Sequence, residues 1–147
     1  MTGLSTVTQP QPSAGVPSAS LWAGRIMSGL ATVFFTFDGV MKFIQPQVVI
    51  DATRQIGWPA DAATLAVLGA ILLACAALYA FPRTATLGAI LLTGYLGGAV
   101  AAHARLGDPL FTHILFGVYL GLFVWGGLWC RDARIRALIP IGISRSG

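Results

Sequence analysis

The sequence predicts an all-α integral membrane protein, a four-helix bundle with a short amphipathic interfacial helix between the first and second spans. The 147 residues are 56% hydrophobic and only 10% charged, and their mean hydropathy is +0.78. In a soluble domain about a quarter of the residues are charged, so this chain has too few charged residues to cover the surface of a soluble protein. The apolar residues also gather in four long blocks. Together these observations exclude a water-soluble enzyme, a disordered chain and a nucleic-acid-binding domain as leading interpretations.

Each apolar block is long enough to cross a bilayer as a helix. Crossing about 30 Å of hydrocarbon takes about 20 residues at a rise of ~1.5 Å per residue. Only helices and closed barrels satisfy the backbone in lipid, and these continuous runs lack the alternation of barrel strands. The predicted spans are residues 21–44, 62–81, 85–104 and 110–130.

The longest connection, residues 45–59, has the pattern of a short amphipathic helix. Pro46 suits a first helical turn, and Gly57 is placed to end the helix. The apolar residues that share one face are Val48, Val49, Ala52 and Ile56. We expect this helix to lie at the membrane surface, with Trp58 at the level of the headgroups.

The chain outside the spans is expected to form two tails. Residues 1–20 carry no charged side chain and are rich in Ser, Thr, Pro, Gly and Gln, which is typical of a flexible segment. Residues 21–138 would form the membrane domain, and residues 139–147 a short basic C-terminal tail.

The basic residues predict the orientation of the bundle. Four spans place both termini on one side, which would hold Arg25, Arg83, Arg131, Arg134, Arg136 and Arg145. The other side would hold Lys42, Arg54 and Arg105. Because positive residues favour the cytoplasmic side, both termini are expected to be cytoplasmic.

Asp38 is the most informative single residue. It lies roughly 6–8 Å below the outer interface at ~1.5 Å per residue, where a charge is costly and normally has a partner. Lys42 follows four residues later on the same helix face. Two interpretations stay open: an ion pair whose lysine extends to water, or a carboxylate that accepts a proton or orients a substrate.

Other ionisable residues are predicted to lie at the same outer end, including Asp108. His103 could relay protons there, because histidine titrates near neutrality. The catalytic candidates are Asp38 and His103, and the candidate substrate-binding residues are Lys42, Arg105, His113 and Tyr95. The alternative is a set of interfacial polar residues with no shared site. No histidine spacing indicates a metal site.

Small residues recur at four-residue spacing in two spans and indicate close helix packing. They are Gly94, Gly98 and Ala102, and then Gly117 and Gly121. Such faces could meet within one chain or between copies.

Cys75 and Cys130 match no paired motif, so they are interpreted as small buried hydrophobes, with a redox pair as the alternative.

Several segments resemble the DoxX-like family of small bacterial membrane proteins. They include F-D-G-V-M-K-F at residues 37–43, G-W-P at residues 57–59 and P-L-F-T-H at residues 109–113. The resemblance covers about residues 21–138. It implies a compact four-helix bundle in a bacterial inner membrane, related to a thiosulfate:quinone oxidoreductase and to proteins linked to membrane redox complexes and thiol stress.

The resemblance therefore implies a subunit or accessory of a membrane redox complex, linked to quinone or thiol chemistry. Quinone is the candidate cofactor, and the expected partners are the lipid bilayer and a redox protein, with no nucleic acid. The alternative is a non-catalytic membrane scaffold or assembly protein that forms homo-oligomers through its small-residue helix faces. Whether the chain is itself an enzyme stays open, since it has no nucleophile elbow, phosphate-binding loop, haem attachment motif or dinucleotide fingerprint.

Overall fold

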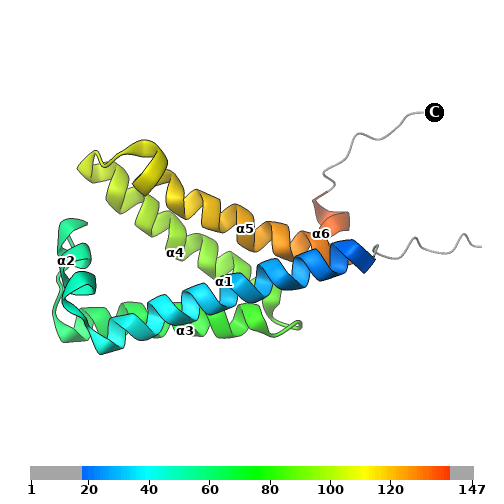
Figure 1. Ribbon diagram of the computed structural model, residues 1–147, viewed down its shortest axis with the longest axis horizontal. Helices are drawn as coiled ribbons and strands as arrows, with labels where there is room; N and C mark the ends of the chain where they lie inside the picture. The colour runs from blue at the N-terminus through cyan, green and yellow to red at the C-terminus, as the bar shows by residue number, and fades with distance from the viewer. Residues whose placement is uncertain (1–17, 140–147) are drawn as a thin grey trace, which may run out of the picture.

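The computed structural model describes residues 18–139, and every regular element within them is helical (Figure 1). The first three spans are α1 (Ser18–Ile44), α3 (Ala62–Ala80) and α4 (Ala85–Leu106). The fourth consists of the π-helical turn η1 (Leu110–Ile114) followed by α5 (Leu115–Arg131). All four are long and apolar enough to cross a membrane. The predicted fold class is confirmed.

The four spans form a ring in which each helix packs against two neighbours. Helix α1 packs against α3 and α5, and α4 packs against the same two, so α1 and α4 stand on a diagonal. Figure 1 shows α4 and α5 diverging from α1 and α3 toward the end that carries α2 (Gln47–Gln55). We call this the α2 end, and the opposite end, where Ser18 and Ile139 lie, the terminal end. The Ser20 hydroxyl donates to the Cys130 carbonyl there at 3.1 Å.

The buried core fills the bundle between the terminal end and its middle. Tyr79 on α3 is completely buried. Its hydroxyl donates to the Val124 carbonyl on α5 at 2.8 Å and lies 3.0 Å from the Ser28 hydroxyl on α1. One phenol therefore joins three helices, and it satisfies polar groups that would be costly to leave unpaired in an apolar interior. The same buried cluster includes Ala31, Phe35, Leu72, Leu92, Leu96 and Leu128.

The two predicted small-residue faces behave differently. A Cβ on Gly117 would lie 2.8 Å from a Val100 methyl carbon, so α5 and α4 approach closely at this point within one chain. Gly94 and Gly98 have no atom within 4 Å of an added Cβ. The Gly94–Gly98 face is therefore not a helix-packing contact in this chain, but borders open space.

The crossing of α1 and α5 depends on two glycines, Gly24 and Gly127, that lie outside the predicted small-residue faces. A Cβ on Gly24 would lie 2.7 Å from the Gly127 carbonyl oxygen, and a Cβ on Gly127 would lie 2.8 Å from the Ser28 hydroxyl oxygen. These glycines let the two backbones meet at the terminal end.

The predicted amphipathic helix is present as α2, and its two ends are sharp turns. Gln45 before it has φ 55° and Gly57 after it has φ 79°, both in the left-handed region. Pro46 caps the helix in an extended conformation rather than lying in its first turn. The Gln45 side-chain amide also donates to the Ala62 carbonyl at 3.3 Å, which ties this turn to the start of α3.

A further short helix, α6 (Ala133–Leu138), follows the last span and was not predicted. The Asp132 side chain caps it by accepting from the Arg134 N–H at 2.9 Å. Arg136 then donates to the Ser20 hydroxyl at 3.0 Å and to the Cys130 carbonyl at 3.1 Å. The predicted tails lie outside the described residues, apart from the first turn of α1 and Ile139.

Candidate functional site

A cavity of about 840 Å³ lies at the α2 end, between α1, α2 and α4. We call it the large chamber. Its polar and ionisable side chains include Asp38, Lys42, Tyr95, His103, Asp108 and His113. All the predicted site residues except Arg105 are therefore on the wall of one cavity. Asp38 and His103, on diagonally opposite helices, share it.

On α1, Asp38 and Lys42 form the expected ion pair. The Lys42 ammonium donates to the Asp38 carboxylate at 2.7 Å, because residues four apart share a helix face. The Lys42 side chain is only 12% exposed and that of Asp38 is 39% exposed. The lysine is thus the more buried partner and does not extend away from the bundle. Both groups line the large chamber.

On α4, His103 is held by a carboxylate that follows it in sequence. Gly107 ends the helix with φ 71°, a left-handed conformation that turns the chain back on itself. Asp108 is thereby brought to 2.6 Å from His103 Nδ1. When Nδ1 donates to this carboxylate, the proton of a neutral ring is fixed on Nδ1 and Nε2 remains an acceptor.

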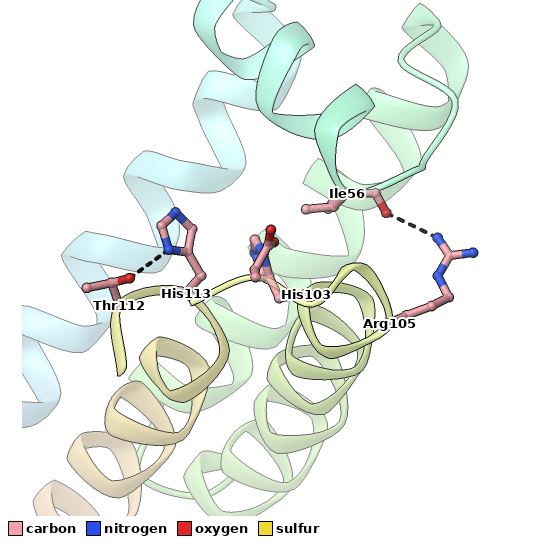
Figure 2. A network of polar contacts seen from close by, with 6 residues as sticks. Ile56, His103, Arg105, Thr112 and His113 are labelled. Carbon is pink, nitrogen blue, oxygen red and sulfur yellow. Dashed lines mark hydrogen bonds and ion pairs between the residues drawn. The ribbon is translucent and has the colours of Figure 1, made fainter. Parts of the chain in front are cut away.

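His113 comes from the π-helical turn η1, which begins the fourth span after Pro109. Its ring centroid lies 5.7 Å from that of His103, with the two rings tilted by 58°. Its Nδ1 lies 2.8 Å from the Thr112 hydroxyl. Figure 2 shows the two histidines on neighbouring segments, near the chain that follows α2. Single π-helical turns are frequent at functional sites.

Arg105 is the predicted site residue that does not line the large chamber. Its guanidinium donates to the Ile56 carbonyl at 3.4 Å (Figure 2). It also lies against Gly57, where a Cβ would be 2.5 Å from the guanidinium nitrogen Nη2. Arg105 therefore joins the end of α4 to the end of α2, whereas a substrate-binding role was expected from the sequence.

The apolar face of α2 and two glycines of α4 complete the walls. The expected amphipathic face lines the chamber through Val48, Val49, Ala52 and Ile56, with Trp58 beside it. Gly94 and Gly98 also line it, and their missing side chains leave space. Sequence reasoning did not assign these residues to a site. The available signal was the four-residue spacing of Tyr95, Ala99 and His103, which places all three on one face of a helix.

A second cavity of about 170 Å³ adjoins the first, between α1, α4, η1 and α5. We call it the small chamber. Its apolar walls include Phe34, Phe35, Leu96, Val100, Phe116 and Leu120. This chamber was not predicted, because phenylalanines in an apolar span look the same whether they face lipid, core or cavity.

The assembled side chains can exchange protons and form hydrogen bonds with a bound molecule. Lys42 supplies donors, the Asp38 carboxylate is an acceptor, and His103 can act in either role. Within residues 18–139, no group of three or more His, Cys, Asp or Glu side chains is arranged to hold a metal ion. Cys75 and Cys130 are both free thiols, and Cys75 is part of the buried core.

Comparison with known protein families finds one family that matches this chain. The profile of the DoxX-like family matches residues 26–127, which is more than half of the chain and includes parts of all four spans. No curated protein and no solved structure gives a significant match.

Proposed function

The chain belongs to the DoxX-like family, and on that premise we propose that it is a quinone-binding subunit or accessory of a membrane redox complex. The observation that carries this proposal is the large chamber. It combines an apolar lining with two ionisable pairs from diagonally opposite helices, Asp38–Lys42 and His103–Asp108.

The size and lining of the chamber suit an amphipathic small molecule. Pockets for such ligands are typically about 300–1,000 Å³ and mostly apolar, with a few placed polar groups. The large chamber, at about 840 Å³, falls in this range. A quinone has a ring with hydrogen-bonding oxygens and an apolar chain, so it matches both kinds of wall. A small thiol would leave most of the apolar wall without a contact.

The ionisable pairs supply the proton chemistry that such a ligand needs. Interconversion of quinone and quinol moves two electrons and two protons. In the proposed complex, a partner redox protein supplies or receives the electrons. Asp38 and His103 exchange the protons with the ring oxygens, Lys42 holds the Asp38 carboxylate by a hydrogen bond, and Asp108 orients the His103 ring.

The proposed location is a bacterial inner membrane, with both termini in the cytoplasm. The distribution of charge supports this orientation. Among the described residues, the terminal end holds Arg25, Arg83, Arg131, Arg134 and Arg136, and the α2 end holds Lys42, Arg54 and Arg105. The positive-inside rule then directs the chambers to the periplasmic side.

Quinone binding is tested with the purified protein in lipid nanodiscs, titrated calorimetrically with a decyl-substituted 1,4-benzoquinone. Asp38→Asn and His103→Gln are each expected to weaken binding by about tenfold or more, since a hydrogen bond to a charged group contributes about 1.5–3 kcal/mol. The matched control is Asp51→Asn, because Asp51 pairs with Arg54 at 3.8 Å on α2 and does not line the chamber. Unchanged affinity in both site variants would contradict the proposal.

The role in a redox complex needs a separate measurement in cells. Affinity capture of the chain from detergent-solubilised membranes should recover a redox enzyme, and deletion of the chain should lower quinone-dependent respiration. Restoring the wild-type chain should restore that respiration, and Asp38→Asn should not. Full restoration by Asp38→Asn would mean that the chain supports the complex without using the ionisable site.

A further inference from the structure

The two chambers meet along the diagonal between α1 and α4. Both are lined by the same residues of that diagonal, namely Asp38 from α1 and Tyr95, Ala99 and His103 from α4, with His113 from η1. Helices α1 and α4 are not packing neighbours in the ring. The polar residues therefore form a shared wall, with the large chamber on its α2 side and the small chamber on its α5 side.

The small chamber has the dimensions and lining of a site for one ring. A cavity of about 150 Å³ lined by Leu, Ile and Phe is known to hold benzene, and the small chamber measures about 170 Å³. Phe34 contributes edge-to-face contacts with Phe35 and Phe116, at centroid distances of 5.5 and 6.2 Å. An aromatic guest could add further stacked or edge-to-face contacts with these rings.

We propose that the ligand divides between the chambers, with a single six-membered ring in the small chamber and its chain in the large chamber. This inference rests on the proposed function, and it specifies which size of quinone ring the site selects. A polar ring substituent then lies at the shared wall, within the set of Asp38, Tyr95 and His103. The apolar face of α2 covers the chain.

This arrangement predicts selection against bicyclic rings. A second fused ring would have to displace the phenylalanine walls of a chamber of about 170 Å³, whereas the large chamber of about 840 Å³ would accept either ring. The dissociation constants of decyl-substituted 1,4-benzoquinone and decyl-substituted 1,4-naphthoquinone are therefore compared in nanodiscs. We expect the monocyclic compound to bind at least about tenfold more tightly, because moving packed side chains to admit a larger ring is costly.

Substitutions in the walls test whether the small chamber causes the preference for a monocyclic quinone. Phe116→Ala enlarges it from α5 and is expected to bring the ratio of the two dissociation constants close to one. Phe34→Ala enlarges the same chamber from α1 and should act alike, so the test does not depend on one variant folding. Phe111→Ala is the matched control, because Phe111 is 72% exposed and lines neither chamber. That variant should keep the wild-type ratio.

The outcomes separate this inference from the proposed function. A wild-type ratio near one, or a ratio that neither Phe116→Ala nor Phe34→Ala changes, would overturn the placement of the ring and leave quinone binding intact. Failure of both quinones to bind the wild-type protein would overturn the proposed function and this inference with it.

Discussion

His103 Nδ1 lies 2.6 Å from the Asp108 carboxylate, and this contact fixes the orientation of the imidazole ring. The left-handed turn at Gly107 makes the contact by reversing the chain at the end of α4. Asp108 thereby acts as a positioning residue for His103.

Removing this carboxylate should weaken quinone binding without removing the histidine. We expect Asp108→Ala to raise the dissociation constant of the decyl-benzoquinone by about tenfold or more, because His103 loses a charge-assisted hydrogen bond. Asp108→Asn keeps an acceptor oxygen and should recover part of the affinity. Calorimetric titration measures both variants. Equal affinities for wild type, Asp108→Ala and Asp108→Asn would remove Asp108 from the site.

Filling the large chamber should block the ligand and leave the fold intact. Gly98 lines the chamber and has no atom within 4 Å of an added Cβ, so Gly98→Leu places an isobutyl group in open space. We expect quinone affinity to fall by at least about tenfold, with unchanged helicity, because the leucine takes the volume that the ligand needs.

The same variant tests the scaffold alternative. If the chain self-associates through the Gly94–Gly98 face, Gly98→Leu should convert oligomers to monomers in size-exclusion chromatography with light scattering. In that case Asp38→Asn would leave both oligomeric state and function unchanged. If the chamber instead binds quinone, Gly98→Leu should keep the wild-type oligomeric state and lose quinone binding.

Two glycines of α1 should respond in opposite ways to alanine. A Cβ on Gly24 would lie 2.7 Å from a backbone oxygen of α5, whereas Gly29 has no atom within 4 Å of an added Cβ. We expect Gly24→Ala to lower the free energy of unfolding by about 1–3 kcal/mol through overpacking. Gly29→Ala should leave it unchanged or slightly higher, since alanine is the better helix former. Denaturation in mixed detergent micelles, followed by circular dichroism, compares them. Equal effects would contradict the α1–α5 crossing.

The Asp61 cap at the N-terminus of α3 should make a small contribution to stability that is lost at acid pH. The Thr64 hydroxyl, and then the Thr64 N–H, donate to Asp61 and hold the pKa of this carboxyl below its ordinary value. Because the folded pKa is the lower one, the contribution is complete above the ordinary value of 3.8 and is lost as the pH falls through the folded pKa. Melting temperatures between about pH 5 and pH 2 should fall less steeply for Asp61→Asn than for wild type. Parallel slopes would show that the cap is not coupled to folding.

Local residue patterns predicted the four spans, α2 and one of the two ionisable pairs that line the large chamber. The spans follow from apolar runs of bilayer length, and α2 follows from its amphipathic spacing between Pro46 and Gly57. The Asp38–Lys42 pair was predictable because helix geometry alone brings residues four apart together. The His103–Asp108 pair is also local, but it depends on the φ of Gly107, which four-residue spacing does not describe.

The sequence by itself determined that this is a four-span bundle with its site candidates at one end, since those features depend on composition and on repeats of three to four residues. Only the tertiary structure decided that Asp38 and His103 face common chambers, that Gly94 and Gly98 leave space in place of a helix contact, and that Arg105 joins α4 to α2. These outcomes depend on which helices stand diagonally and how far they diverge. The packing of all four spans sets that geometry, and no single span carries the information.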